Sequence, residues 1–515
     1  MGSWARLALL LSLLLITACT SLPHRTNRAP TQTLVAAADS PLARVARDAG
    51  IAPGRSGLRA MPEADVALDA RFALIRNATV SIDVQSYQIG NDSVGRSLLR
   101  ALRDAARRGV RVRLLVDDFY TRDVDELLLG LAALPQVEVQ LFNPFTSGRS
   151  SSLLRTVGLL GDFDRLNHRM HNKLLVADGA VAVVGGRNLA DEYFFRHAEA
   201  NFIDFDMLLV GSVVPQLSTW FDVYWNSSTV YPLHQIVRDP MTAAERLADF
   251  DRLTSGDGAP PAVTRPDMYG DPPLALELGT RRFALVEGEA QAWADPPGKA
   301  QIADPAGPTV KQRFMQEMGK AHRQLTLFSP YFIPGESGVA SLKTARARGV
   351  EVKVVTNSLA ASDEPLVNVG YSQYRVELLK SGVRLFEVAS ERLKSDSRIG
   401  RLLGASAGRL HAKMAYIDTD TVLVGSMNLD PRSEHINTEI GVVVHSPQIA
   451  QRMLSVFDTD RNVDYEVALS ADGEGLVWVS RSGSREDRSI AEPGNGWWQR
   501  LKLRLMWMLV SEDLL

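Results

Sequence analysis

The sequence predicts an α/β protein built from two copies of one domain. Two segments of the same pattern lead to this prediction: His171-Asn-Lys173-Leu-Leu-Val-Ala-Asp178 and His411-Ala-Lys413-Met-Ala-Tyr-Ile-Asp418. They lie 240 residues apart (171 to 411), and the segments Arg-Gly-Val-Arg-Val and Arg-Gly-Val-Glu-Val, which begin at Arg108 and Arg348, have the same separation. A strand, a helix and a strand are expected in the same order in both copies, and this order gives an α/β unit with a right-handed crossover.

Local patterning predicts the elements of each copy. In the first copy, Leu98, Leu99, Leu102 and Ala105 recur at helical spacing, and Gly109 ends that helix. The predicted elements are a strand over 78–87, a helix over 97–108 and a strand over 110–116, followed in the second copy by a helix over 310–322, a strand over 324–328, a helix over 337–347 and a strand over 350–356.

Each histidine segment is predicted to form a hairpin; in the first copy, strands over 174–177 and 180–184 meet at Asp178-Gly179. Asp178 and Asp418 are therefore expected to hold the turn or an ion pair. Six residues later the copies continue as Gly185-Gly186-Arg187-Asn188 and Gly425-Ser426-Met427-Asn428. The two asparagines are expected to begin a helix or to line a pocket.

The chain begins with a predicted secretory signal, because Arg6 is followed by an apolar run over 7–16 and then by Thr-Ala-Cys19. This ending resembles a bacterial lipobox, in which the cysteine is acylated. Cys19 is the only cysteine, so no intramolecular disulfide can form. The alternative is an ordinary signal peptide or anchor with an incidental cysteine. Thr20 after the cysteine favours sorting to the outer membrane and leaves the inner membrane possible.

With 515 residues, 45% of them hydrophobic, the chain is long enough for two domains of moderate size. The predicted segments are a lipoprotein signal peptide over 1–19, a tether over 20–60, a first domain over 61–250, an irregular connection rich in Pro, Gly and Asp over 251–308, a second domain over 309–480 and a C-terminal tail over 481–515. Short strands are expected within the connection at 283–287 and 290–294. The tail contains an aromatic and basic helix over 497–510, which suits packing on the core and a membrane interface equally.

Charge and histidine content limit the partners. The net charge is −3, so no overall basic field attracts nucleic acid, and no nucleic-acid partner is expected. Only nine histidines are present, without a cysteine pair or a His-Glu-x-x-His pattern, so neither a metal nor a cofactor is expected.

Two matched histidines suit chemistry at a phosphodiester. One imidazole attacks phosphorus, and the other protonates the departing alkoxide and then activates an incoming alcohol or water. Lys173 and Lys413 are expected to compensate the charge of the nonbridging oxygens. Asn188 and Asn428 are expected to donate hydrogen bonds to the same oxygens.

These residues closely resemble the phospholipase D superfamily, whose motif His-x-Lys-x4-Asp-x6-Gly-[Gly/Ser]-x-Asn occurs here twice. Further segments, 167–171, 185–194, 329–334 and 428–439, resemble bacterial cardiolipin synthases, most nearly those of the C type. The resemblance covers about residues 60–515. It implies two duplicated α/β/α sandwich domains, related by a pseudo-twofold axis, with one active site at their interface.

The resemblance also implies roles for individual residues. His171 is expected to be the nucleophile and His411 the acid and base, although the two roles are exchangeable. Glu439 and, after a longer insertion, Asp206 are expected to support the histidine rings. Ser426 is expected near the phosphate, and the first copy has Gly186 in its place.

The implied function is transfer of a phosphatidyl group to phosphatidylglycerol, yielding cardiolipin, with phosphatidylethanolamine as a possible donor. Such an enzyme is expected at a membrane of the bacterial envelope, as a periplasm-facing lipoprotein. A phospholipase D, phosphodiesterase or nuclease that passes the intermediate to water is one alternative. A non-catalytic envelope lipoprotein is the other.

Overall fold

The computed structural model describes residues 22–24, 28–146, 149, 152–256, 260–301, 307–388, 407–456, 465–482, 485–493, 496, 502, 505 and 506. The predicted signal peptide with Cys19 lies outside the described residues, and so does most of the predicted helix over 497–510. No helix in the described part of the chain has the length and apolar composition needed to cross a bilayer.

Both halves contain a sheet with the same strand order, which confirms the predicted duplication. The first-half order is β4-β3-β2-β5-β6-β8-β1, and the second-half order is β13-β12-β11-β15-β16-β17-β10. The first-half strands are β1 (Ser56–Met61), β2 (Ser81–Ser86), β3 (Arg111–Asp117), β4 (Val137–Phe142), β5 (Leu174–Ala177), β6 (Val181–Gly185) and β8 (Asp206–Gly211). The second-half strands are β10 (Val286–Ala294), β11 (Gln324–Phe328), β12 (Glu351–Asn357), β13 (Arg384–Val388), β15 (Met414–Ile417), β16 (Thr421–Gly425) and β17 (Ile440–His445).

The two sheets join into one through β1 and β10, which pair antiparallel over three residues from Ser56 with Gly288 to Leu58 with Val286. β1 and β10 occupy equivalent places in the two strand orders, so this junction lies where a twofold axis would pass between the halves. Short strands extend the outer edges: β9 (Val230–Pro232) beside β4, and β18 (Tyr465–Leu469), β19 (Leu476–Ser482) and β20 (Arg485–Ser489) beside β13.

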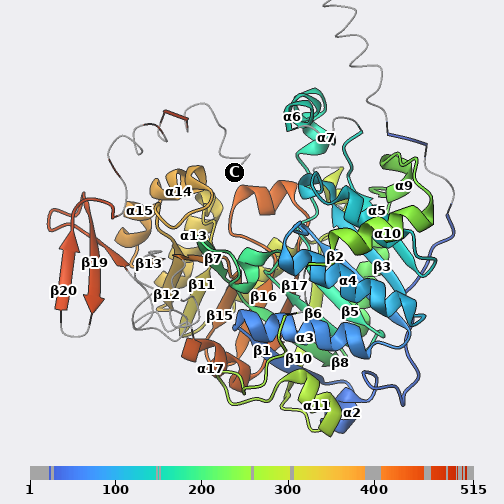
Figure 1. The fold of residues 1–515 in the computed structure, drawn as a ribbon. Coiled ribbons are helices and arrows are strands. Elements are labelled where there is room, and N and C mark those ends of the chain that lie inside the picture. The colour runs from blue at the N-terminus through green and yellow to red at the C-terminus, as the bar shows by residue number, and fades with distance from the viewer. Residues whose placement is uncertain are drawn as a thin grey trace, which may run out of the picture.

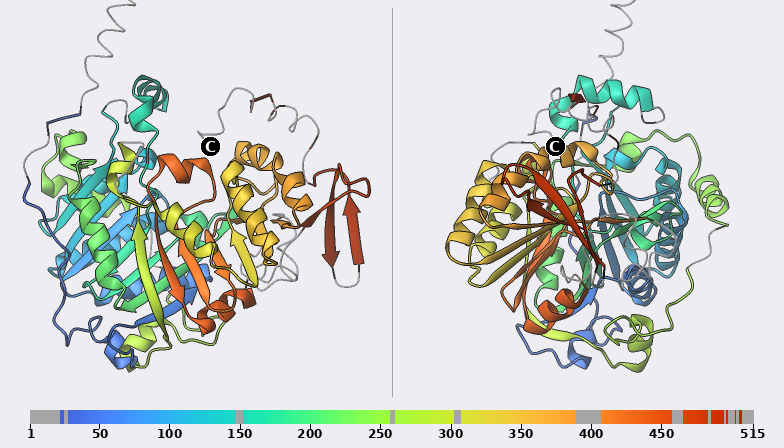
Figure 2. Two further views of the ribbon diagram at one scale, coloured as in Figure 1. Left: turned by 180° about the vertical axis from the view of Figure 1, so that it is seen from behind. Right: turned by 90° about the vertical axis from the view of Figure 1, so that its left-hand side faces the viewer.

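Helices cover the sheets on both faces (Figures 1 and 2). The outer face of the first half packs against α3 (Ala64–Asn77), α4 (Ser93–Arg107) and α5 (Asp125–Ala132), and that of the second against α12 (Val310–Met318), α13 (Gly335–Ala347) and α15 (Arg375–Lys380). A third core lies between the halves and includes residues of α8 (Val214–Trp225) and α17 (Pro447–Val456). Each of these helices contacts a strand of the opposite half: α8 contacts β10, and α17 contacts β1.

The predicted local elements form because the chain carries their start and stop signals. Asp92 accepts a hydrogen bond from the Gly95 N–H and so caps α4, whose predicted apolar face is buried. Gly109 and Gly349 follow α4 and α13 at φ +93° and +87°, a conformation that glycine adopts without strain. The repeated Arg-Gly-Val segments are therefore the ends of two equivalent helices.

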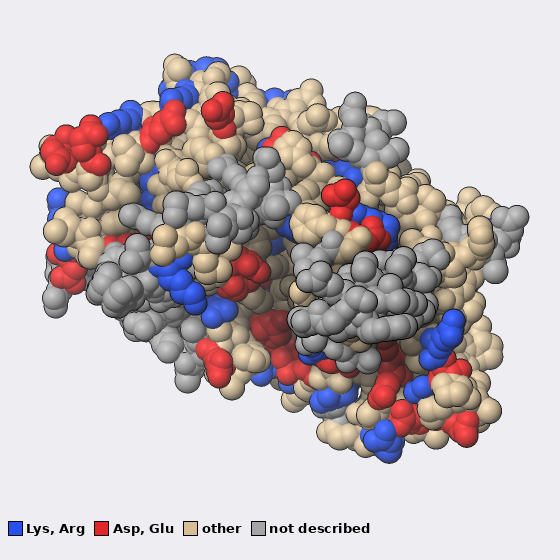
Figure 3. Space-filling view, turned by 90° about the horizontal axis from the view of Figure 1, so that it is seen from above, with Lys and Arg blue, Asp and Glu red and all other residues tan. Residues whose placement is uncertain are grey.

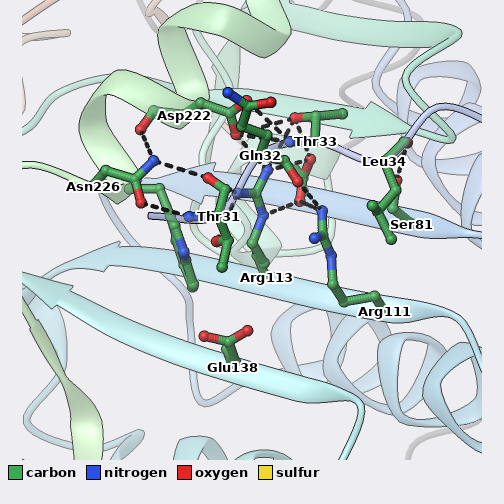
Figure 4. A network of polar contacts seen from close by, with 12 residues as sticks. Thr31, Gln32, Thr33, Leu34, Ser81, Arg111, Arg113, Glu138, Asp222 and Asn226 are labelled. Atoms are coloured by element: carbon green, nitrogen blue, oxygen red, sulfur yellow. Dashed lines mark hydrogen bonds and ion pairs between the residues drawn. The ribbon is translucent and has the colours of Figure 1, made fainter. Parts of the chain in front are cut away.

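The predicted tether over 20–60 is wrong for most of its length. Thr31 and Thr33 donate backbone hydrogen bonds to Asn226 and Asp222 of the first half, and Arg113 joins Asp222 to Asp83 at 2.7 and 2.6 Å (Figure 4). Residues 56–61 then form β1, inside the joined sheet. Polar side chains hold this segment, so its lack of apolar periodicity did not reveal that it is ordered.

The predicted connection over 251–308 also contributes to the fold. It contains α11 (Leu274–Thr280), and its two expected short strands form a single strand, β10. The strand alternates buried and exposed residues from Val286 to Ala292, as a half-buried strand should. The sheet of the second half therefore begins before the predicted boundary at 309.

Candidate functional site

The two histidines lie at equivalent points, immediately before the β5–β6 and β15–β16 hairpins, and both are buried. Their backbone N–H groups are held by the opposite half: His171 donates to the Thr438 carbonyl at 2.9 Å, and His411 donates to the Ile203 carbonyl at 2.8 Å. Contacts between the halves therefore position both histidine backbones.

The imidazole rings are held across the same boundary. His171 Nδ1 lies 3.1 Å from Glu439 Oε2, and His411 Nδ1 lies 2.6 Å from Asp204 Oδ2. Both carboxylates are fully buried. Each half thus supplies the carboxylate that orients the histidine of the other half.

The prediction that Asp206 supports a histidine ring is wrong, because Asp204 contacts the histidine instead. The Asp206 carboxylate faces Arg187 at 3.1 Å and Arg71 at 3.0 Å. Residues two apart in an extended segment point to the same side, so the sequence Asp204-Phe-Asp206 offers two equivalent candidates. The sequence therefore located the supporting carboxylate to this segment but could not show that Asp204, rather than Asp206, contacts the histidine.

The Gly186 and Ser426 difference follows from the length of these carboxylates. Ser426 donates its hydroxyl to Glu439, which also accepts from Ser433 Oγ at 2.9 Å. A Cβ atom at Gly186 would lie 2.1 Å from Asp204 Oδ1. The first half therefore has no room for a serine where the shorter aspartate packs against the backbone.

The two lysines lie buried beside the histidines. Lys173 and Lys413 donate their Nζ groups to the carbonyls of His171 and His411, each at 2.7 Å. Burial lowers the pKa of Lys413 to about 8 and also lowers the pKa of Lys173, with Glu439 and Asp204 opposing this effect. The charged side chains of the two halves therefore interact within one cluster.

Burial also sets the charge of the rings and their partners. It lowers the pKa of His411 to about 4, together with the Lys413 charge, and lowers that of His171 well below its usual value. Both imidazoles are thus neutral near neutrality. Burial raises the pKa of Glu439 to about 7, whereas at Asp204 the contact with His411 outweighs burial and holds the pKa at about 2.

A cavity of about 560 Å³, which we call the interface cavity, joins these groups. Its lining comes from both halves and includes Tyr87, His171, Asn188, Glu192, Tyr193 and Phe202 of the first and Tyr331, Asp363, Glu364, His411, Asn428 and Asp430 of the second. Aromatic rings pack on the imidazoles: Tyr87 lies 5.0 Å from His171, and Phe202 lies 4.7 Å from His411 between ring centroids. Seen from above, the molecule is hollowed near the middle of this face, and acidic side chains gather there (Figure 3).

The two asparagines reach the cavity as predicted. Asn188 donates to the Tyr193 hydroxyl at 2.7 Å, and the Oδ1 atoms of Asn188 and Asn428 have no hydrogen-bond partner among the described residues. Asp430, which the sequence did not single out, also lines the cavity, and burial raises its pKa to about 7.

Asp178 and Asp418 belong to the repeated motif but do not line the cavity. Asp178 has φ +54° in the hairpin turn, and its carboxylate accepts hydrogen bonds from the N–H groups of Thr79, Val80 and Ser81. Asp418 has φ +51° and accepts from the N–H groups of residues 322–324. Each aspartate therefore ties its hairpin turn to the start of a neighbouring strand, which is the structural role expected for them.

A family model described as "Cardiolipin synthase, PLD-like domain" matches residues 72–225 and 314–461, one segment in each half of this chain. The chain belongs to this family. The PLD-like match confirms the predicted superfamily and the predicted enzyme class.

Similar proteins agree with this membership. Cardiolipin synthase C of Escherichia coli (strain K12) is 37% identical over 465 residues, which are 90% of this chain and 97% of that protein. A cardiolipin synthase of Staphylococcus aureus (strain Mu50) is 26% identical over 79% of this chain and 67% of its own length. The crystal structure of phosphatidylserine synthase from Haemophilus influenzae Rd KW20 has a TM-score of 0.52 and 14% identity over 82% of this chain and 91% of that chain, so it supports the fold alone.

Proposed function

We propose that this PLD-like protein transfers a phosphatidyl group to the primary hydroxyl of phosphatidylglycerol, so that cardiolipin forms. The observation that carries the proposal is the pair of neutral imidazoles at one cavity, each held at Nδ1 by a carboxylate of the other half. With Nδ1 engaged, Nε2 is the ring nitrogen left for chemistry.

In the first step, His171 Nε2 attacks phosphorus and forms a phosphohistidine, while the bond from phosphorus to the headgroup oxygen breaks. His411 gives its proton to that oxygen. Although His411 is neutral in the free protein, the bound phosphodiester anion raises its pKa and allows it to carry this proton. Lys173 and Lys413 offset the charge of the nonbridging oxygens.

In the second step, neutral His411 takes the proton of the phosphatidylglycerol hydroxyl, and the hydroxyl oxygen attacks phosphorus. The bond between phosphorus and His171 breaks, and cardiolipin leaves. The Tyr193 hydroxyl that contacts Asn188 can donate as well as accept, so a half-turn of the Asn188 amide presents N–H groups to the phosphate.

The phosphatidyl donor is proposed to be phosphatidylethanolamine. Glu192, Asp363 and Glu364 line the interface cavity together with Tyr87 and Tyr331, and carboxylates with aromatic faces attract an ammonium headgroup. Headgroup-labelled lipids test this choice. Release of labelled ethanolamine is expected, and release of labelled glycerol alone would identify phosphatidylglycerol as the donor.

We also propose that Cys19 is acylated and that the protein works at a membrane of the bacterial envelope. Labelling with a radioactive fatty acid is expected to mark the protein, and Cys19→Ser is expected to abolish the label. Envelope fractionation then assigns the inner or the outer membrane.

The central experiment expresses the protein in cells that lack cardiolipin. Cardiolipin is expected with the wild-type chain and with His168→Ala, whose imidazole contacts the Asp164 carbonyl and does not line the cavity. It is not expected with His171→Ala. Labelled phosphatidylglycerol that ends as phosphatidic acid would show hydrolysis instead, and a fully active His171→Ala variant would exclude this mechanism.

A further inference from the structure

A short helical pair lies at the rim of the interface cavity. α6 (Ser152–Gly161) and α7 (Phe163–Leu166) follow one another, and Leu159, Phe163 and Leu166 line the cavity. α6 projects above the rest of the first half in Figure 1. One side of this helical pair therefore faces the interface cavity, and the other side faces away from the protein.

Apolar side chains are exposed at this rim. Leu154 and Val157 on α6 are 51% and 44% exposed, and Phe163 and Tyr120 beside them are 37% and 46% exposed. They are four of the twelve large hydrophobic residues that are most exposed in the described part of the chain. Single exposed hydrophobic residues are common, but a group at the mouth of a cavity marks an interaction site.

Buried cations fix α6 in this position. Arg155 is 9% exposed, donates to the Phe119 carbonyl at 2.7 Å and lies 4.8 Å from the Phe145 ring. Arg149, just before the helix, contacts Asp125 at 2.6 Å and also Asp118. Leu154 and Val157 are three residues apart and lie on the same side of the helix, so the anchored helix presents both together.

We propose that α6 inserts Leu154 and Val157 into a phospholipid surface and so holds the mouth of the interface cavity against it. The inference rests on the proposed function, in which a headgroup must enter the cavity while its acyl chains stay in the bilayer. A shallow apolar contact with flanking polar residues is what an interfacial helix makes.

The position of the N-terminal segment favours the same surface. Residues 22–24 lie on the upper side of the molecule in Figure 1, as α6 does. Residue 22 comes three positions after Cys19 in the chain, and three extended residues span about 10 Å at most. An acyl group at Cys19 would therefore enter lipid on the side where α6 projects.

A spin label tests insertion without turnover. In the mature, acylated protein on vesicles of phosphatidylethanolamine and phosphatidylglycerol, a nitroxide at Val157→Cys is expected to lose access to a water-soluble nickel complex and to gain access to oxygen. Leu276→Cys on α11 is the control, because Leu276 is 55% exposed and α11 lies at the bottom of Figure 1. Equal nickel access at both sites on vesicles would overturn the proposal. Low nickel access at 157 before vesicles are added would show that another protein copy covers α6 and would overturn it as well.

Activity gives a second, independent result. The double variant Leu154→Glu/Val157→Glu is expected to lose at least about tenfold in rate on vesicles and to keep its rate on short-chain phospholipids dissolved as monomers, because neither residue lines the cavity. Leu276→Glu is expected to keep both rates. An equal loss on both substrates would overturn the proposal. A failure of the proposed chemistry itself would appear in the His171→Ala comparison and would leave the spin-label result unchanged.

Discussion

Replacing Asp204 by Asn tests the contact between halves that orients His411. The contact spans 2.6 Å between a fully buried carboxylate and a buried imidazole. A hydrogen bond to a charged group contributes about 1.5–3 kcal/mol. At about 1.4 kcal/mol for each factor of ten in rate, its loss lowers kcat/KM by about 10- to 150-fold.

The pH profile should change in a defined direction. Burial and Lys413 lower the pKa of His411, and Asp204 opposes them, with the result that this pKa is about 4. Removing the carboxylate lowers the pKa further, so His411 accepts a proton less readily. The assay is cardiolipin formation from labelled phosphatidylglycerol over a range of pH, and the acidic limb of the profile is expected to move to lower pH.

Asp206→Asn is the matched control. Asp206 is also buried and lies two residues away, but it contacts Arg187 and Arg71 rather than a histidine. This variant is expected to be less stable and to keep the acidic limb of the wild type. An unchanged kcat/KM and profile for Asp204→Asn, or the same profile shift in Asp206→Asn, would refute the reasoning.

Four further predictions rest on the same contacts. Asp178→Ala leaves three backbone N–H groups without their acceptor, so the free energy of unfolding in urea should fall by about 3 kcal/mol while kcat stays constant; a lower kcat at unchanged stability would place Asp178 in the chemistry. Gly186→Ser should inactivate the enzyme because its Cβ would meet Asp204, whereas Ser426→Gly should retain measurable turnover of labelled lipid; equal losses would contradict this. The rate should fall as pH rises through about 8, where Lys413 loses its charge, and Lys413→Arg should move this limb to higher pH in the same assay. Because this pKa is lower in the folded state than its usual 10.5, the Lys413 contribution to stability should rise with pH between these values, and urea unfolding of the wild type and Lys413→Met checks the sign.

The parts of the fold that the sequence predicted well are those whose signals are local. The strand predicted over 324–328 coincides with β11, and the helix over 97–108 falls within one residue of the end of α4 and four residues of its start. Apolar spacing and a terminal glycine determine such elements. Repetition then supplied the relation between the halves.

β1 was missed because its signals are distant. All six of its residues are buried, so no alternation of polar and apolar residues marks it as a strand. Arg59 in its middle is tolerated there because Asp267 and Glu277, more than 200 residues away, contact its guanidinium at 3.0 and 2.8 Å. Only the folded chain brings these charges together.

The repeated motif predicted which histidines and asparagines come together, whereas the supporting carboxylates, which lie outside the motif, were predicted less well. His171, His411, Asn188 and Asn428 meet at one cavity as expected. The choice between Asp204 and Asp206 depends on which carboxylate crosses the boundary between halves. The spacing of residues along one half of the sequence does not indicate which carboxylate reaches the other half.

The exchange of carboxylates between the halves has a consequence for the origin of the molecule. A chain that carried a single half would have its histidine on one surface and the matching carboxylate aimed at a missing neighbour. Two such chains in a symmetric dimer would restore both contacts at once, whereas a monomer would restore neither. Gene fusion of such a dimer would yield the present arrangement and would leave each half free to diverge; the aspartate with glycine in one half and the glutamate with serine in the other are differences of this kind.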